Sequence, residues 1–362
     1  MAVQDSVAAR LSRTRQVASL RIRERLEHGE DQLLTAEATR ATQAIRDEAE
    51  DPSPTRTAFQ VDRDRIVHSK PFRRTKHKTQ VFLAPIGDHY RTRLTHILEV
   101  SQIGRSTAVA LGLNEDLVEA MALGHDIGHT PFGHIGEELL AKFLPDGFRH
   151  NQQSVRIVEK LERGGKGMNL TRQTRDGILK HSAPTTGGVE TAAWGVPETP
   201  EGWATRYADK VAYLHHDVDD AIRAGIIGND DIPREVRASL GSTREDRLDT
   251  MIYDVIVSSY GKPTVTMSDE VLEATNALRK FMFENVYLAG AAKTEDEKAQ
   301  GMLWDLLQYY EAHPDRMPAE HQRIAERDGV KRAVADYIAG MTDGYALDMF
   351  EELFIPAAWG RR

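Results

Sequence analysis

Apolar residues recur at helical spacing along most of this 362-residue chain, and very few segments alternate polar and apolar residues as a β-strand does. The stripe of His96, Val100, Ile103 and Thr107 follows the i, i+4, i+7, i+11 rule and predicts a helix over residues 91–112. His96 belongs to the mostly apolar face of that helix, so it is expected to point inward. The chain is therefore predicted to be all-α.

Capping residues set the beginning of further helices. Asn114 is a good N-cap, because its side-chain oxygen can accept a hydrogen bond from a backbone N–H group of the first turn, and it predicts a helix that runs to His125. Ser268 predicts in the same way a helix over 268–288. The remaining predicted helices cover residues 151–162, 171–181, 203–224, 247–259, 293–312 and 329–353.

Three stretches fit this helical pattern less well. Residues 1–50 predict one or two helices that are exposed or packed on a neighbour, and they end at a proline-containing break over 51–54. Residues 182–202 and 228–247 are predicted to be irregular. Either of these two stretches could form a lid or an oligomer contact.

Composition narrows the class of protein. The hydrophobic content of 40% is enough for a substantial core, and no apolar run reaches the eighteen or so residues that cross a bilayer. The absence of cysteine excludes disulfides and thiolate metal ligands, so a transition-metal site must use histidine and carboxylate. We expect a cytoplasmic protein without a membrane partner.

The charge of the chain is uneven. Its formal net charge of −9 argues against a dedicated surface for duplex nucleic acid, although binding of nucleic acid is still possible. Seven basic residues nevertheless gather with the single acid Asp64: Arg63, Arg65, Lys70, Arg73, Arg74, Lys76 and Lys78. This stretch predicts a site for a small polyanion, or else a solvated face or a subunit contact.

A dense group of metal-binding side chains lies in residues 124–134, where His125, Asp126, His129 and His134 occur within eleven residues. Each histidine on a short apolar segment needs a partner for its ring nitrogens, and a metal supplies one. A second group follows on the helix predicted over 203–224. Asp209, Tyr213 and Asp217 are spaced four apart, so they share one helix face.

Together these segments offer two imidazoles and two carboxylates as metal ligands: His96, His125, Asp126 and Asp209. Such a donor set without sulfur suits manganese, iron, cobalt, nickel or zinc. The order of the four residues resembles the signature of the HD superfamily of metal-dependent phosphohydrolases. Further blocks resemble the bacterial dGTP triphosphohydrolase-like family over about residues 56–359, namely 72–82, 90–96, 150–154, 176–181 and 336–343.

The resemblance implies an HD-domain helical fold with additional N- and C-terminal helices. We expect an N-terminal helical extension over 1–55, an HD catalytic core over 56–225, and a C-terminal helical region over 226–362 that packs on the core within one continuous domain. The resemblance also favours one divalent ion, manganese or magnesium. It implies a homo-oligomer, a hexamer or tetramer, and a dNTP effector as a further possible partner.

The resemblance further implies hydrolysis of a dNTP by attack of water at the α-phosphorus, giving a deoxynucleoside and tripolyphosphate. Gln80 and Asp217 would hold the sugar 3′-hydroxyl, and Tyr213 would pack against the sugar and leave little room for a 2′-hydroxyl. Arg93 and Lys210 would hold the phosphates, which need fixed cationic donors.

Proton transfer is also required, because the departing 5′-oxygen must gain a proton. The family places catalytic groups at the positions of His134 and Glu137, and we expect His134 to donate the proton or orient the nucleophile, with Glu137 tuning it. His129 and His150 match further active-site histidines. His181 matches a family block, but the sequence assigns it no role.

Several other residues have weaker predictions. His215 and His216 are expected to point away from Asp209 and to be structural. His68, His77 and His89 lie near the basic stretch, where they could help to bind phosphate, and the glycine-rich residues 163–167 predict a surface turn rather than a phosphate loop.

Two alternative functions stay open. Another HD phosphohydrolase, a nucleotidase or a phosphodiesterase, would use the same four metal ligands. A nucleotide sensor or nucleic-acid-binding regulator with slow turnover would keep the pocket and use the basic stretch.

Overall fold

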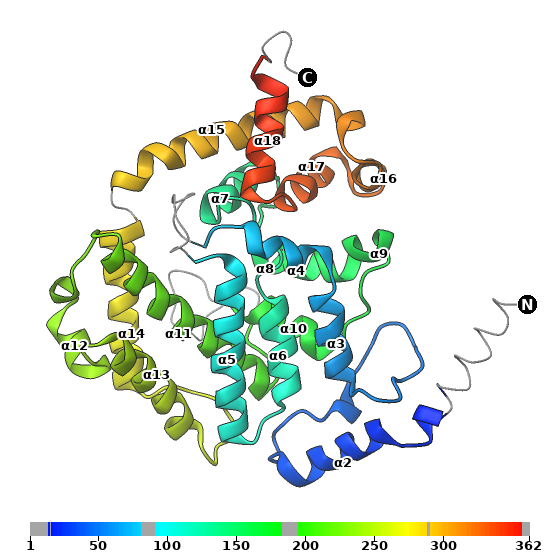
Figure 1. The fold of residues 1–362 in the computed structure, drawn as a ribbon, viewed down its shortest axis with the longest axis vertical. Helices are drawn as coiled ribbons and strands as arrows, with labels where there is room; N and C mark the ends of the chain where they lie inside the picture. The colour runs from blue at the N-terminus through cyan, green and yellow to red at the C-terminus, as the bar shows by residue number, and fades with distance from the viewer. Residues whose placement is uncertain (1–13, 15, 81–90, 183–194, 288–289, 357–362) are drawn as a thin grey trace, which may run out of the picture.

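The computed structural model describes residue 14 and residues 16–80, 91–182, 195–287 and 290–356, and Figure 1 shows their arrangement. These parts of the chain are helical and contain no β-strand, and their only extended pairing is an isolated bridge between Thr79 and Thr92. The predicted all-α class is therefore confirmed.

The centre of the molecule is a group of helices that pack side by side (Figure 1). Helix α5 (Arg93–Leu111) packs along both α6 (Glu115–Gly124) and α11 (Pro200–Arg223). Helices α3 (Ala58–Val67) and α10 (Arg172–Lys180) cover α6 from other sides. This packing brings the metal-binding segments near one another, because His96 lies on α5, His125 follows α6, and Asp209 lies on α11.

The predicted caps explain several of these boundaries. The Asn114 side chain accepts a hydrogen bond of 3.3 Å from the backbone N–H of Leu117, and Ser268 caps α14 (Asp269–Met282) through Val271. Both predictions are confirmed. Helix α5 ends at Gly112, whose φ of +65° is the left-handed conformation that glycine adopts without a Cβ penalty.

Two large apolar clusters form most of the core of the described chain. Helices α12 (Arg234–Leu240), α13 (Arg244–Ser259) and α14 pack with α11 in the first cluster. The second cluster joins α7 (His134–Phe143) to the group at the top of Figure 1. That group consists of α15 (Gly290–Ala312), α16 (Ala319–Asp328), α17 (Val330–Ala339) and α18 (Asp343–Phe354). Within residues 124–134, Phe132 belongs to the second cluster, and Ile127 belongs to a third one with Ile66 and Ile97.

Shorter helices complete the described chain. Helix α2 (Ile22–Leu33) lies near the N-terminus of the described chain. Helix α4 (Lys70–Arg74) follows α3. Helix α8 (His150–Arg156) continues into a π-helical turn, Ile157–Leu161. A kinked turn, α9, covers Glu162–Gly165, where Arg163 and Gly164 have positive φ values. The turn predicted over 163–167 lies here.

Three sequence expectations were wrong. Residues 228–247 are not irregular throughout, because Val236 and Leu240 bury one face of α12. The helix predicted over 329–353 is two helices, since the chain breaks after α17 and Thr342 caps α18. The helix expected before the break at 51–54 ends early, at Leu33. Residues 183–194, most of the other predicted irregular stretch, lie outside the described residues.

None of the helices in the described chain is long and apolar enough to span a bilayer.

Gly128 offers a test of the packing that holds residues 124–134. A Cβ atom at this position would lie 2.2 Å from the backbone nitrogen of Ser154 and 2.4 Å from the carbonyl oxygen of His150. We expect Gly128→Ala to lower the free energy of unfolding by about 1–3 kcal/mol, because helix α8 would have to move. Urea unfolding followed by circular dichroism measures this change.

Gly301 provides the matched control. It lies within α15, and a Cβ atom there would have no neighbour within 4 Å. Gly301→Ala should stabilise the protein by up to about 1 kcal/mol, because alanine favours the helix. Equal effects of the two substitutions would contradict the close approach of Gly128 to α8.

Candidate metal centre

The segment that follows α6 is completely enclosed. Every residue over 121–133 is buried, and His134 is the first exposed side chain after it. Ser154 of α8 clamps this segment, because its hydroxyl accepts a hydrogen bond of 2.9 Å from the N–H of Gly128 and donates one of 2.7 Å to the carbonyl of His125. The His-Asp pair is thus fixed by backbone contacts.

The four predicted metal ligands converge in this enclosed region. Nε2 of His96 lies 3.4 Å from Nε2 of His125 and 3.2 Å from Oδ1 of Asp209. Nε2 of His125 lies 3.5 Å from Oδ1 of Asp126 and 3.7 Å from Oδ1 of Asp209. Donors around one ion, each about 2.0–2.2 Å from it, are roughly 3.0–3.6 Å apart. His96, His125 and Asp126 therefore offer donor atoms close enough to share one divalent ion, and Asp209 adds a carboxylate beside both histidines.

The proton positions agree with this donor set at His125. Its Nδ1 lies 2.6 Å from the carbonyl oxygen of Ala122, which can only accept a hydrogen bond. Nδ1 therefore carries the hydrogen, and the Nε2 lone pair faces the other three donors. Such an outer hydrogen bond is the usual partner of a histidine that binds a metal.

The groups that surround Asp126 and Asp209 favour the ionised forms of these two carboxylates. Burial by itself raises the pKa of Asp209, but the hydrogen bond with His96 and the nearby ring of His125 lower it to about 2. Burial also opposes ionisation of Asp126, yet its pKa is well below the usual range because His125, His129 and Arg93 surround it. Both carboxylates are thus charged at neutral pH, as metal ligands must be.

Arg93 is almost fully buried, and its guanidinium lies 2.5 Å from Oδ2 of Asp126. It was predicted to hold substrate phosphate. In the structure its direct partner is a predicted metal ligand, together with the backbone carbonyl of Thr79. A phosphate bound at this point would therefore share Arg93 with Asp126.

The predicted proton-transfer residues divide into two groups. Glu137 accepts hydrogen bonds from both the backbone N–H (2.9 Å) and the ring Nδ1 (3.1 Å) of His150. Burial lowers the pKa of His150, but the charge and hydrogen bond of Glu137 outweigh it and raise the pKa above its usual value. His129 stacks on His150, with ring centroids 3.9 Å apart.

His134 lies outside this enclosed group. Its side chain is 85% exposed, and its Nδ1 lies 3.7 Å from Glu137. Its ring centroid is 6.1 Å from that of His129. The carboxylate expected to tune His134 therefore binds His150 more closely.

His181, which had no predicted role, lies between the metal ligands and His150. Its Nε2 is 3.2 Å from Nε2 of His150, while its Nδ1 donates to the carbonyl of Ile178 at 2.8 Å. Its ring centroid lies 4.7 Å from that of His125. Burial lowers the pKa of His181 to about 3, so it stays neutral at ordinary pH and can accept a hydrogen bond from His150.

The predicted sugar and phosphate residues extend the site along α11. Tyr213 is close enough to Asp209 and Asp217 for both to affect its pKa, which burial raises above the usual range. Lys210 donates a hydrogen bond of 2.6 Å to Asn276 on α14. Gln80 comes from another side, beside Gly133, and its Oε1 is buried without a hydrogen-bond partner among the described residues.

Two cations near Lys210 were missed by the sequence reasoning. Burial, followed by the positive charges of Arg279 and Arg206, lowers the pKa of Lys210 to about 7. Arg206 precedes Lys210 by four residues on α11, so helical spacing could have found it. Arg279 lies on α14, and only the packing of α14 against α11 brings it here.

The expectation for His216 was wrong. Its Nε2 lies 2.9 Å from Nδ1 of His96, in direct contact with a predicted metal ligand. Seven residues separate it from Asp209, and seven residues complete almost two helical turns, so His216 returns to the same face. His215 does turn away, and its ring contacts Arg244 on α13 at 3.0 Å.

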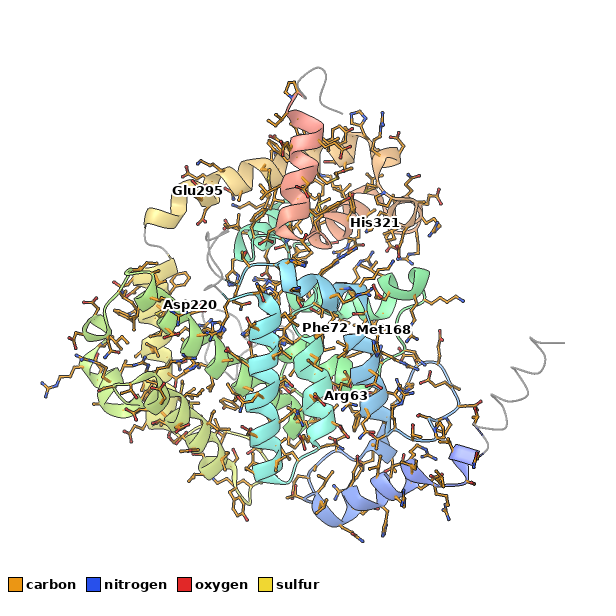
Figure 2. All side chains as sticks on the ribbon, in the orientation of Figure 1. Arg63, Phe72, Met168, Asp220, Glu295 and His321 are labelled. Atoms are coloured by element: carbon orange, nitrogen blue, oxygen red, sulfur yellow. The ribbon has the colours of Figure 1, made fainter. Side chains whose placement is uncertain are left out.

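The residues of the predicted basic stretch lie in two different surroundings. Arg63 and Arg65 form ion pairs with Glu119 and Glu50, whereas other members border a cavity of about 320 Å³. Figure 2 shows α4, marked by Phe72, on one side of this region and His321 of α16 on the other. The basic and histidine side chains that line the cavity are His68, Lys70, Arg73, Arg74, Lys78, Arg163 and His321.

Lys78 connects this cavity to the metal segment. Its ammonium group is buried and donates to the backbone carbonyls of His129 and Ala339. His77 is exposed and is not among the residues that line the cavity. His89, the third histidine predicted near the basic stretch, lies outside the described residues.

Two known protein families match the chain. The HD domain matches residues 93–214, which include all four predicted metal ligands. The phosphohydrolase-associated domain matches residues 265–352, which cover α14 to most of α18. The finer division into segments 1–55, 56–225 and 226–362 stays a prediction.

Named relatives extend over nearly the whole chain. A deoxyguanosinetriphosphate triphosphohydrolase-like protein of Caldanaerobacter subterraneus is 53% identical, over 94% of this chain and 98% of the relative. A protein with the same name from Clostridium perfringens strain 13 is 46% identical, over 93% and 98%. Among solved structures, a hypothetical protein from Aquifex aeolicus is 18% identical, with a TM-score of 0.45 over 83% of this chain and 69% of that chain.

Asp209 tests the metal centre. Asp209→Asn keeps the shape of the side chain but removes an anionic donor. We expect the Mn²⁺ affinity to fall by more than the roughly 10- to 100-fold that loss of a ligand's outer hydrogen-bond partner costs. Equilibrium dialysis of Mn²⁺ against the full chain measures this loss.

The control is Asp219→Asn on the same helix, where the carboxylate pairs with Arg223 at the surface. This substitution should leave the Mn²⁺ affinity unchanged. A similar loss in both variants would count against Asp209 as a ligand.

Proposed function

We propose a function from one premise: this chain belongs to the HD-domain family of deoxyguanosinetriphosphate triphosphohydrolase-like proteins. The protein is a phosphohydrolase of that family, and we propose that it cleaves a deoxynucleoside triphosphate into the deoxynucleoside and tripolyphosphate. The observation that carries this proposal is the approach of the four predicted ligands beside Asp217, Tyr213 and Lys210 on α11, where Tyr213 lies close to both Asp209 and Asp217.

His96, His125, Asp126 and Asp209 would hold one divalent ion. Manganese or magnesium is proposed first, and iron, cobalt, nickel and zinc also suit this donor set. The ion would polarise a phosphoryl oxygen and lower the pKa of a bound water.

The remaining residues would select and orient the substrate. Asp217 and Gln80 would bind the sugar 3′-hydroxyl, and the ring of Tyr213 would exclude a 2′-hydroxyl. The buried Oε1 of Gln80 has no hydrogen-bond partner within the described part of the chain, and this supports the role, because a buried polar atom is costly to leave without a partner. Lys210 and Arg93 would hold phosphate oxygens, with Arg206 and Arg279 adding positive charge near Lys210.

The reaction requires a proton for the leaving group. The water oxygen bonds to the α-phosphorus, the bond from that phosphorus to the 5′-oxygen breaks, and the 5′-oxygen takes a proton. We assign proton donation to His150, because Glu137 favours its protonated form and because it lies within 3.9 Å of Asp126. His129 would support His150 by stacking, and the exposed His134 would act at the entrance of the site.

A second ligand is proposed for the cavity between α4 and α16, where five lysines and arginines outnumber the acids Glu162, Glu320 and Asp336. Its arginines and lysines suit a phosphate-bearing effector such as a dNTP. Lys78 would carry the effect of binding, since it joins the cavity wall to the carbonyl of His129. A homo-oligomer, as a hexamer or tetramer, completes the proposal.

Product analysis tests the function directly. The full-length protein is incubated with each dNTP alone and with all four mixed, in Mn²⁺ or Mg²⁺, and the products are separated by anion-exchange chromatography. We expect tripolyphosphate and the deoxynucleoside, with ribonucleotides cleaved more slowly. Turnover that requires the mixture would support the effector.

The other outcomes separate the alternatives. Pyrophosphate together with dNMP would contradict attack at the α-phosphorus with release of the 5′-oxygen. Orthophosphate from a nucleoside monophosphate would indicate a nucleotidase, and cleavage of a cyclic nucleotide would indicate a phosphodiesterase. Binding of dNTP without turnover under any of these conditions would favour a sensor or regulator.

Lys210 gives a pH-dependent test of phosphate binding. Its pKa of about 7 means that it is charged below that pH and neutral above it. We expect kcat/KM to fall as pH rises through 7, because the neutral amine no longer attracts phosphate. In Lys210→Arg the guanidinium stays charged throughout, so this fall should disappear. An identical pH profile in the variant would exclude Lys210 as its cause.

A further inference from the structure

Two buried residues extend the metal centre beyond its four ligands. His216 is completely buried, and its ring meets that of His96 edge-on with centroids 5.0 Å apart. Nε2 of His216 lies 2.9 Å from Nδ1 of His96, and Nδ1 of His216 lies 2.7 Å from Oδ1 of Asp217. His96, His216 and Asp217 thus form a continuous row of polar contacts.

The contact with Asp217 favours one position for the ring hydrogen of His216. Nδ1 of His216 lies 2.7 Å from Oδ1 of Asp217, and this contact favours a hydrogen on Nδ1, because a bare nitrogen would oppose the lone pairs of the oxygen. His216 and Asp217 are adjacent on the helix, so this contact is electrostatic rather than a linear hydrogen bond.

The hydrogen positions of His216 and His96 are linked, because a neutral imidazole carries only one N–H group. With its hydrogen on Nδ1, His216 has a bare Nε2, which can accept from Nδ1–H of His96. In the absence of an ion, Nε2 of His96 can carry the hydrogen that bonds to Asp209. An ion held by these donors would replace that hydrogen bond, and the lone pair of His96 would then be on Nε2, with the hydrogen on Nδ1 facing His216. Asp217 would therefore favour, through His216, the form of His96 whose Nε2 can bind a metal.

We propose that His216 is a positioning residue that ties Asp217 to the metal ligand His96, so that Asp217 acts at the metal as well as at the sugar. The metal part of this inference depends only on the row of contacts. The sugar part rests on the proposed function, which assigns the 3′-hydroxyl to Asp217. Asp217 would thus bind the sugar directly and would also affect metal binding through His216 and His96.

The chain supplies a matched control in the preceding residue. His215 is also buried on α11, but its ring contacts Arg244 on α13 rather than His96. Substitution of either histidine removes a buried imidazole from the same helix. Only His216 has the contact that would change metal binding.

The test measures the Mn²⁺ dissociation constant of the full-length protein without nucleotide, by electron paramagnetic resonance titration. We expect His216→Gln and Asp217→Asn each to weaken Mn²⁺ binding about 10- to 100-fold, and His215→Gln to stay within about twofold of the wild type. The double variant His216→Gln, Asp217→Asn should bind no more weakly than the weaker single variant, because both substitutions break the same row.

Three results would overturn the inference: unchanged Mn²⁺ affinity in Asp217→Asn, an equal loss in His215→Gln, or additive losses in the double variant. Circular dichroism checks the fold of each variant. If His216→Gln does not fold, Asp217→Asn decides alone, because asparagine keeps the shape of the side chain. No nucleotide is present, so failure here leaves the products of the proposed reaction as a separate question.

Discussion

The close approach of two imidazoles and two carboxylates is the constraint on which the rest of this site depends. The two imidazoles lie 3.4 Å apart, and each lies within 3.7 Å of both carboxylates, in a largely buried place where ionised groups without compensation are costly. The apolar cluster between α5 and α11 holds His96 and Asp209 at this distance. Helix packing therefore supports the placement of these ligands, and a divalent cation bound to them would offset the cost of burying the carboxylates.

The segment after α6 connects the predicted metal site to α8, α17 and α18. Ser154 and Gly128 lock it against α8, and the backbone N–H of Phe132 donates to Asp343 at the start of α18. Lys78 adds contacts to both the segment and the end of α17. The C-terminal helices are thus part of the support of the metal centre, although the four proposed ligands all lie in α5, α11 and the segment after α6.

Neighbouring groups give the same residue type different chemistry here. His125 points its Nδ1–H at a carbonyl and keeps a bare Nε2 for the ion. His150 is held by Glu137, which favours its protonated form, while burial keeps His181 neutral. His134 is exposed only nine residues after His125. A histidine-rich motif therefore indicates a chemical site, but the partner of each ring decides what that ring can do.

Much of this architecture could be predicted from local sequence. The helical stripe of His96 and the caps at Asn114 and Ser268 depend on neighbours in the chain, so their positions were predicted correctly. The choice of the four ligands depended on residue type and order. The prediction of a single helix over 329–353 was wrong because it rested on the apolar stripe, which does not show a break, although Thr342 is itself a local N-cap signal for α18.

What the sequence determined by itself was the helical class, the residues able to bind a metal, and the membership of a phosphohydrolase family suggested by their order. Tertiary structure decided which groups touch: Glu137 with His150, Arg93 with Asp126, and Arg279 near Lys210. The contact of His216 with His96 also needs α5 and α11 to pack together. Periodicity predicts the face on which a side chain lies, but only the packing of one helix against another decides which atom lies opposite it.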